Sequence, residues 1–416
     1  MSPPACIPCR ASVVRTTALS LLLASAAPAV AQEFLDQVQE ALDLSTPSGW
    51  ARVNFSSLFD LEGYAYQDPP PGLIFGDTAF VNPRLRLFGE AQFGEQWYAF
   101  AQFQANRGFD PRAEVRNAQF YEYFLRWTPS PSGVANLQFG EFATCFGSWV
   151  KRHYSWDNPF VTAPTPYEQV LTISDMTAPA SPQAFLARKA IPANKQSWVP
   201  LIWGPSYTSG GTVFGSVDRW DYAVEFKNAS LSSRPPAWSA FDQGWQNPTI
   251  SGRTGWRPSA EWNIGVSGSG GTYLLPSAAG TLPAGTDLGD FQQYTAGLDA
   301  GWSRHRWQVW SEVFLARFQV PNVGNADLAG AYVEAKYKFT THLWGAARMN
   351  AMVFGTVSDG EGGQSRWDNN AWRLDLSAGW RFNEHWQLKL QYSYGEEQSP
   401  GIEGNNLFAG QITLRF

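Results

Sequence analysis

The sequence predicts an all-β fold in which about sixteen antiparallel strands close into a transmembrane β-barrel. Polar and apolar residues alternate with a period of two from Trp50 to the chain end, a pattern typical of strands with one wet face and one lipid face. Residues 407–416, LFAGQITLRF, repeat this pattern and end on an aromatic residue. After residue 32 no uncharged apolar run reaches 18 residues, which excludes a transmembrane helix. A membrane-spanning chain of this kind must form a closed barrel, because an open sheet leaves backbone groups unpaired in lipid.

The composition supports a barrel with a polar interior. The chain of 416 residues contains 20 Trp, 28 Phe and 38 Gly, yet its mean hydropathy is below zero. Aromatic girdles around a polar lumen account for this combination. A formal charge of −6 argues against a nucleic-acid partner. The alternative is a soluble β-sandwich, whose strands would be shorter and whose outward face would be polar.

The first 49 residues are expected to stand apart from the barrel. Residues 1–31 combine Arg10 and Arg15, an apolar run and an Ala-Val-Ala cleavage site, which predicts a cleaved signal peptide and export. Its removal leaves Cys145 alone and excludes an intramolecular disulfide. Residues 32–49 contain a helical spacing over 33–44 and predict a short periplasmic helix or leader. A small plug and a trimerisation helix remain alternatives for this helix.

Residues 50–416 are expected to form the barrel, with seven short turns alternating with eight longer loops. The even strand count places both chain ends on the periplasmic side. In the strand over 114–127, Glu122 and Arg126 are expected to face the lumen, with Tyr121 and Tyr123 outward. The first expected strand begins at Trp50, and the third follows the turn near Gly94. The other fourteen are expected over 80–91, 114–127, 134–142, 212–217, 220–228, 253–260, 262–272, 291–302, 307–319, 330–339, 343–354, 372–382, 386–394 and 407–416.

Residues 143–210 interrupt the strand rhythm and are too long for a hairpin loop. Because sixteen strands enclose a lumen rather than a packed core, such a loop can narrow the pore. It places Lys151, Arg152 and His153 together, and rings of cations favour anions where a pore narrows. The predicted selectivity residues are these three with Arg84, Arg86 and Arg126 on the facing wall. A solvated surface loop is the alternative.

The same loop contains the aromatic residues Trp149, Tyr154 and Trp156. Aromatic faces stack on the apolar face of a sugar ring, so these residues are candidates for solute stacking in a sugar-selective channel. Packing of the loop against the barrel wall is the competing interpretation.

The strand number, the loop order and the aromatic chain end resemble the sixteen-stranded general and substrate-selective porins of Gram-negative outer membranes. Among these, the phosphate-selective porins are the nearest comparison, because residues 151–153 form a cationic group. The resemblance implies a constriction loop folded into the lumen, passive diffusion of small hydrophilic solutes or ions, and a homotrimer in the outer membrane.

No enzymatic activity, cofactor or metal is predicted. Of the four histidines, three lie in short turns, and His153 has no neighbouring nucleophile. The alternative to a porin is a structural or partner-binding barrel, for example a sheath around a redox partner, which a strand count above twenty would favour.

Overall fold

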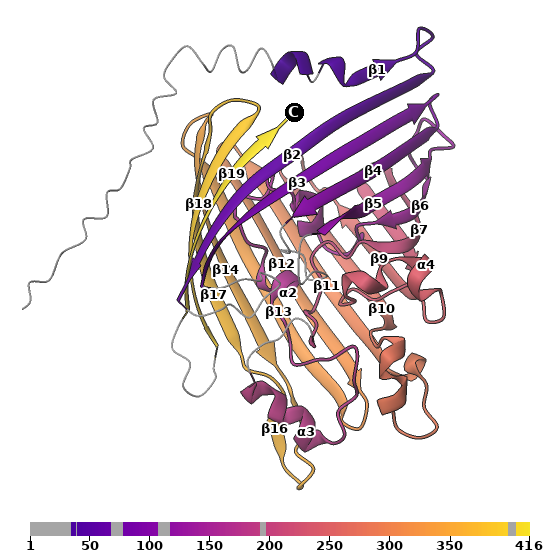
Figure 1. Ribbon diagram of the computed structural model, residues 1–416, viewed down its shortest axis with the longest axis vertical. Helices are drawn as coiled ribbons and strands as arrows, with labels where there is room; N and C mark the ends of the chain where they lie inside the picture. Colours follow the sequence, from indigo (N-terminus) through magenta and orange to yellow (C-terminus); the bar gives the residue numbers. More distant parts are fainter. Residues whose placement is uncertain (1–34, 39, 68–77, 107–116, 192–196, 398–404) are drawn as a thin grey trace, which may run out of the picture.

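The computed structural model describes residues 35–38, 40–67, 78–106, 117–191, 197–397 and 405–416. The predicted signal peptide lies outside these residues. Figure 1 shows long tilted strands that surround a central space. Each barrel strand pairs antiparallel with its neighbours along the chain, and the last strand pairs with the first. The predicted closed antiparallel barrel is therefore confirmed.

Sixteen strands form this barrel among the described residues, as predicted. A short strand, β1 (Asp43–Ser45), pairs with the first barrel strand, and β15 (Thr356–Ser358) pairs with β16 (Gln364–Arg366) in a separate hairpin. The barrel strands are β2 (Ala51–Tyr66), β3 (Ala79–Phe93), β4 (Trp97–Asn106), β5 (Asn117–Trp127), β6 (Asn136–Phe142), β7 (Thr208–Val217), β8 (Trp220–Lys227), β9 (Thr249–Trp256), β10 (Trp262–Thr272), β11 (Gln292–Arg304), β12 (Trp307–Val320), β13 (Gly324–Lys338), β14 (Leu343–Phe354), β17 (Ala371–Arg381), β18 (Trp386–Glu397) and β19 (Asn405–Arg415).

Helices are short. Residues 35–38 and 40–41 are helical, within the range where the sequence predicts a helix. The other helices are η1 (Trp149–Arg152), α2 (Thr165–Glu168), α3 (Pro182–Leu186), η2 (Ala187–Ala190), η3 (Pro235–Ala237), α4 (Ala240–Gln243), η4 (Pro276–Thr281) and η5 (Leu288–Asp290). In the described residues no helix is both long and apolar enough to cross a membrane.

The closing seam between β19 and β2 follows the alternation of the last ten residues. Gln411 pairs with Glu62 and Thr413 with Asp60, and their side chains hydrogen-bond at 2.6 and 2.7 Å. These polar side chains are buried on the inward face, whereas Ile412 is exposed on the outward face. The terminal strand therefore closes the barrel through polar contacts inside and apolar side chains outside.

The two barrel ends differ in their connections. At one end, called here the turn end, consecutive strands are joined by short turns, such as the two-residue turn His305–Arg306 between β11 and β12. His305 has a φ of 54°, as tight hairpin turns require. At the opposite loop end the connections are longer, with one exception. Residues 321–323 form a turn because β13 begins at Gly324, so the longer loop predicted before residue 330 is wrong.

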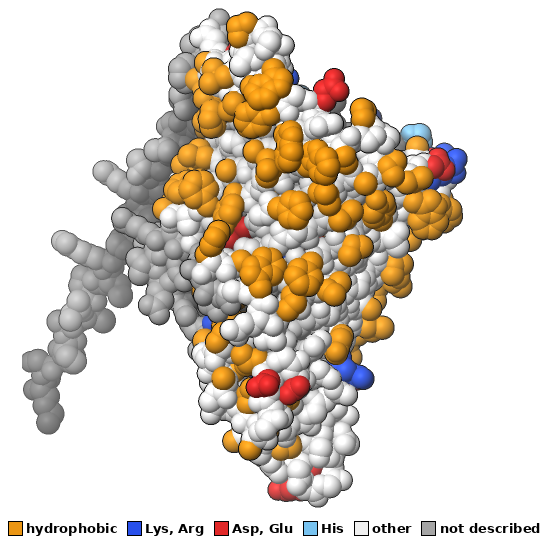
Figure 2. Space-filling view, turned by 90° about the vertical axis from the view of Figure 1, so that its right-hand side faces the viewer, with side chains coloured by type: hydrophobic (Ala, Val, Ile, Leu, Met, Phe, Trp, Pro, Cys, Tyr) orange, Lys and Arg blue, Asp and Glu red, His pale blue; other side chains and the backbone are white. Residues whose placement is uncertain are grey.

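The outward face is apolar, as Figure 2 shows for one side of the barrel. Leu315, Leu390 and Phe408 are each about 60 % exposed there. At the turn end, tryptophans on neighbouring strands form ring pairs, for example Trp97 with Trp127 at a centroid distance of 6.0 Å. Similar pairs occur at Trp220–Trp256 and Trp262–Trp302. This arrangement matches an interfacial aromatic girdle.

A β-bulge changes the predicted facing of one residue. The register between β4 and β5 shifts at Gln102, which pairs with Glu122, while Phe103 pairs with Phe120. Tyr121 is the extra residue and is only 3 % exposed. Its ring contacts Tyr207 inside the barrel. The predicted outward position of Tyr121 is therefore wrong, because a bulge places two successive side chains on one side of the strand.

Candidate solute pathway inside the barrel

The connection between β6 and β7, residues 143–191 and 197–207, is called here the crossing segment. Its backbone N–H groups hydrogen-bond to inward side chains of the far wall. The N–H of Trp149 donates to Glu312 on β12 at 3.0 Å, and the N–H of Val161 donates to Gln391 on β18 at 2.7 Å. Figure 1 shows α2, which belongs to this segment, within the outline of the strands. The segment thus lies inside the barrel.

The crossing segment also contacts the near wall. The N–H of Cys145 donates to Glu225 on β8 at 2.9 Å, and the hydroxyl of Tyr154 donates to Gln102 on β4 at 2.7 Å. Contacts to both walls mean that the segment spans the interior.

An apolar core joins the crossing segment to the wall. Trp149, Tyr167 and Phe314 pack together, with ring centroids of Trp149 and Tyr167 4.6 Å apart. The hydroxyl of Tyr167 donates to Glu312 at 2.6 Å, and burial raises the pKa of this phenol well above its usual value. The expectation of a lumen without a packed core therefore needs correction: long loops from the loop end supply the missing apolar volume.

The structure separates the three cations predicted in the loop. Lys151 is exposed. Arg152 forms an ion pair with Glu334 at 2.5 Å, and its guanidinium lies 4.3 Å from the ring centre of Trp310. Burial alone lowers the pKa of Arg152, but the Glu334 carboxylate raises it, and the net result lies above the ordinary value. Arg152 is thus charged, and Glu334 neutralises that charge.

His153 is enclosed within the crossing segment. Its Nδ1 lies 2.5 Å from the carbonyl oxygen of Val150, and its Nε2 lies 2.6 Å from the hydroxyl of Tyr207. Nδ1–H therefore donates to the carbonyl, and Nε2 accepts from the tyrosine. Burial lowers the pKa of His153 to about 3. The imidazole is neutral at physiological pH and adds no positive charge to the pathway.

The three predicted wall arginines also differ from one another. Arg84 donates to Glu62 at 2.7 Å, and Arg86 pairs with Asp60 at 3.1 Å. Arg126 instead donates twice to Gln138, at 3.1 and 2.9 Å. Its guanidinium also lies over the rings of Tyr98, Phe124 and Phe214. Arg126 therefore has no carboxylate partner among the described ion pairs.

Two of the three aromatic residues proposed for solute stacking are buried. Trp149 packs on Tyr167, as described above, and Trp156 is only 6 % exposed. The guanidinium groups of Arg381 and Arg415 lie 4.4 and 4.1 Å from the Trp156 ring centre. Tyr154 remains half-buried. The packing role is favoured for both tryptophans.

A lysine of the barrel wall holds the crossing segment in place through hydrogen bonds to its backbone. The ammonium of Lys389 donates to the carbonyl oxygens of Ser155, Asn158 and Phe160 at 2.7, 3.0 and 3.1 Å. Its side chain is 1 % exposed. Residue spacing indicates only that Lys389 faces inward, and its function as an anchor depends on the path of the segment.

A cationic group lies at the turn end of the interior. Arg381 and Arg415 flank Trp156, and Lys336 lies 4.5 Å from the ring centre of Trp344. None of these three cations has an ion-paired carboxylate in the described part of the chain. Their inward facing follows from strand alternation, but their lack of an ion-paired carboxylate could not be read from the sequence.

No protein-family model matches this sequence, and no curated protein matches it. Solved structures match its fold. In-vitro folded OmpT of Vibrio cholerae has 10 % identity and a TM-score of 0.55, covering 90 % of this chain and 99 % of that chain. Its trimer form matches with the same identity and TM-score over 88 % and 99 %. OmpF of Salmonella typhi, in complex with daunomycin, has 11 % identity and a TM-score of 0.54 over 90 % and 100 %.

At such low identity the likeness shows the fold alone. A closed sixteen-stranded antiparallel barrel of this kind is an outer-membrane β-barrel, and the fold indicates a location in the outer membrane.

Proposed function

We propose that the protein is a porin that lets small hydrophilic solutes or ions diffuse passively across the outer membrane, with a preference for anions. The proposal rests on one difference inside the barrel: the buried acidic side chains have partners, whereas several basic side chains lack an ion-paired carboxylate. Carboxylates such as Asp60, Glu62 and Glu334 are paired with arginines and buried. Glu312 and Glu225 accept backbone N–H groups of the crossing segment.

Several cations remain outside this pairing. Lys151, Arg126, Arg381 and Arg415 have no ion-paired carboxylate in the described part of the chain, and Lys151 and Arg415 are exposed. The exposed Asp157 and the half-buried Glu90, neither of which has an ion pair among the described residues, oppose them. Because a net positive lining lowers the energy of an anion in a narrow pore, this imbalance supports anion preference despite the net negative charge of the chain.

The structural matches support the remaining parts of the proposal. The matched chains include the OmpF porin and a trimer form of OmpT, which supports a diffusion channel and a homotrimer. Sedimentation equilibrium of the detergent-solubilised protein measures the oligomer. A sheath around a redox partner is disfavoured, since it calls for more than twenty strands and the described barrel has sixteen.

Single-channel recording in planar bilayers with a salt gradient tests this function. We expect ohmic conductance steps and a reversal potential on the anion side. The double variant Lys151→Gln and Arg126→Gln should move the reversal potential toward zero. Arg317→Gln is the matched control, because Arg317 is exposed on the outward face and paired with Asp327. Folded protein that never conducts would contradict the porin proposal, and cation selectivity would contradict the anion preference alone.

A further inference from the structure

A histidine in the last short turn is held in one tautomer by the backbone. His385 lies between β17 and β18 and is 1 % exposed. Its Nδ1 lies 2.9 Å from the carbonyl oxygen of Arg415, and the side chain of Asn383 accepts the N–H of His385 at 3.0 Å. A carbonyl oxygen only accepts, so Nδ1 carries the proton and the Nε2 lone pair points away from the strand.

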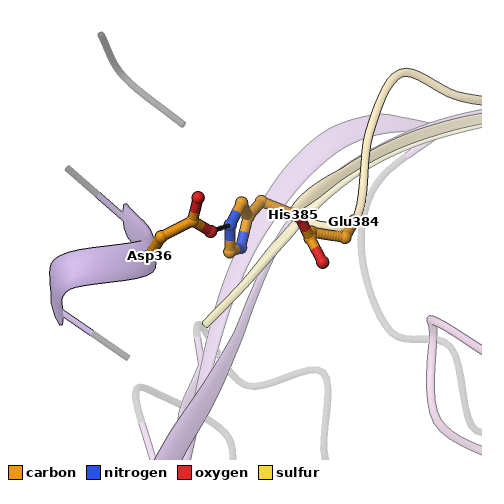
Figure 3. Close-up of side chains that lie close together, drawn as sticks. All are labelled: Asp36, Glu384 and His385. Carbon is orange, nitrogen blue, oxygen red and sulfur yellow. Dashed lines mark hydrogen bonds and ion pairs between the residues drawn. The ribbon is translucent and has the colours of Figure 1, made fainter. Parts of the chain in front are cut away.

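That lone pair faces a carboxylate. Nε2 of His385 lies 2.9 Å from Oδ1 of Asp36, which belongs to the N-terminal helical residues. Figure 3 shows Asp36 pointing at the imidazole, with the carboxylate of Glu384 nearby. Two acceptors at this separation need either a shared proton or a metal ion between them.

The three side chains offer a set of ligands that suits a metal ion. One ligand atom from each of Asp36, Glu384 and His385 lies within 4.8 Å of the other two. Ligands of a tetrahedral zinc ion stand about 3.4 Å apart, given bond lengths of about 2.1 Å. Asp36 and Glu384 are exposed, so both carboxylates can move the remaining distance. Nδ1–H bonded to a carbonyl is also the usual support for a histidine that binds metal through Nε2.

A second turn provides an internal comparison. His342 lies in the turn between β13 and β14, and its Nδ1 is 2.8 Å from the carbonyl oxygen of Arg381. Its backbone N–H donates to Thr340, as that of His385 donates to Asn383. The two turns thus hold histidine in the same way. Among the described residues, however, only the turn with His385 belongs to a group of potential metal ligands.

We propose that Asp36, Glu384 and His385 bind a divalent transition-metal ion of the Zn²⁺ type at the turn end of the barrel. Nitrogen and carboxylate ligands together suit Zn²⁺ better than Mg²⁺, which prefers an all-oxygen shell. A cation lies beside this group, since the Nε of Arg415 donates to the backbone carbonyl of Glu384 at 2.9 Å, and two carboxylates offset its charge. The metal would tie the N-terminal helical residues to the turn beside the terminal strand.

Isothermal titration of untagged, folded full-length protein with ZnCl₂ after removal of metals by EDTA tests this site. We expect one Zn²⁺ per chain, and MgCl₂ should not compete. Asp36→Asn should weaken Zn²⁺ binding at least tenfold while it preserves a hydrogen-bonding side chain. Asp43→Asn, at a half-buried acid of the same N-terminal region that pairs with Arg52, and His342→Ala are the matched controls.

Substitution by Co²⁺ gives a second measurement that does not depend on the stability of a variant. Its visible absorption bands should show a low-coordinate site with nitrogen and oxygen ligands in the parent protein and lose intensity in Asp36→Asn. Unchanged Zn²⁺ affinity in Asp36→Asn, or an equal loss in His342→Ala, overturns the proposal. Absence of any Zn²⁺ binding by folded protein leaves only a hydrogen bond between His385 and Asp36 and likewise overturns the proposal.

Discussion

Single residues inside this barrel derive their electrostatic role from their partners rather than from their own charge. Arg348 is fully buried, lies 2.8 Å from Asp375 and 3.6 Å from Glu334, and donates to backbone carbonyls of the crossing segment. Removing one partner of such a group leaves a buried charge uncompensated, which typically costs about 3 to 5 kcal/mol. Such arginines stabilise the interior, and solutes meet the few cations that lack a carboxylate.

At the same scale, His153 should make the docking of the crossing segment, meaning its packing against the inside of the barrel wall, sensitive to pH. The rings of Trp149 and Tyr154 enclose it, and burial, with the positive charge of Arg86, lowers its pKa to about 3, although the Val150 carbonyl opposes the shift. An undocked histidine titrates near 6.5. As the pH falls from about 6.5 to about 3, His153 binds a proton in the undocked state but not in the docked state. The free energy that favours the docked segment therefore decreases.

Limited proteolysis of the crossing segment between pH 7.5 and pH 4 measures this effect. Cleavage should rise on acidification in the parent protein, and His153→Asn should flatten the curve in this window. Carboxylates also titrate in this pH window, so the effect of His153 is measured as the difference between the parent and His153→Asn curves. His305→Asn, in an exposed turn, is the control. Parallel curves for parent and His153→Asn would contradict the prediction.

At the scale of strands, the alternation of side chains fixes which residues meet lipid. Leu376 on β17 is 46 % exposed on the outward face, while its neighbour Asp375 is fully buried inside. Bulges are the exception to this rule, as Tyr121 shows. They shift the register through contacts between strands, and a single strand's pattern does not reveal them.

Leu376→Arg should destabilise the barrel by about 2 to 4 kcal/mol if this position lies near the bilayer midplane, because an arginine there must be transferred into hydrocarbon. Phe339→Arg, exposed beside a turn, should cost only about 0 to 1 kcal/mol because it lies at the interface. Reversible denaturant unfolding in lipid vesicles gives both free energies. Equal costs at the two positions would show that the assigned depth is wrong.

At the scale of the whole molecule, the crossing segment and the barrel wall stabilise each other. Lys389→Met should release three backbone carbonyls that the lysine now satisfies. We expect the strand content and the closed barrel to survive, while the segment becomes cleavable by protease and the single-channel conductance rises. Lys189→Met is a suitable control, because Lys189 donates to one carbonyl, that of Arg366. Unchanged proteolysis and conductance in Lys389→Met would contradict this anchoring role.

The sequence indicates the closed barrel, the strand number and most side-chain facings, because each of these depends on local alternation. Gln411 and Thr413 illustrate this, since their inward position follows from spacing alone. The site depends on distant pairs. Arg152 meets Glu334 across 182 residues of chain, and no local pattern distinguishes it from the exposed Lys151. Sequence therefore identifies the cations of the interior but not which of them are neutralised.

The position of the crossing segment along the chain has a consequence for the order of assembly. The segment precedes β7, yet its hydrogen-bond partners include Asn350 on β14 and Gln391 on β18. Until those late strands have joined the sheet, the backbone N–H groups of Thr165 and Val161 lack these partners, although the segment can already contact Gln102 on β4. Contacts of such large sequence separation form slowly because loop-closure entropy must be overcome first. Closure of the ring and filling of its interior therefore belong to the same late step of folding.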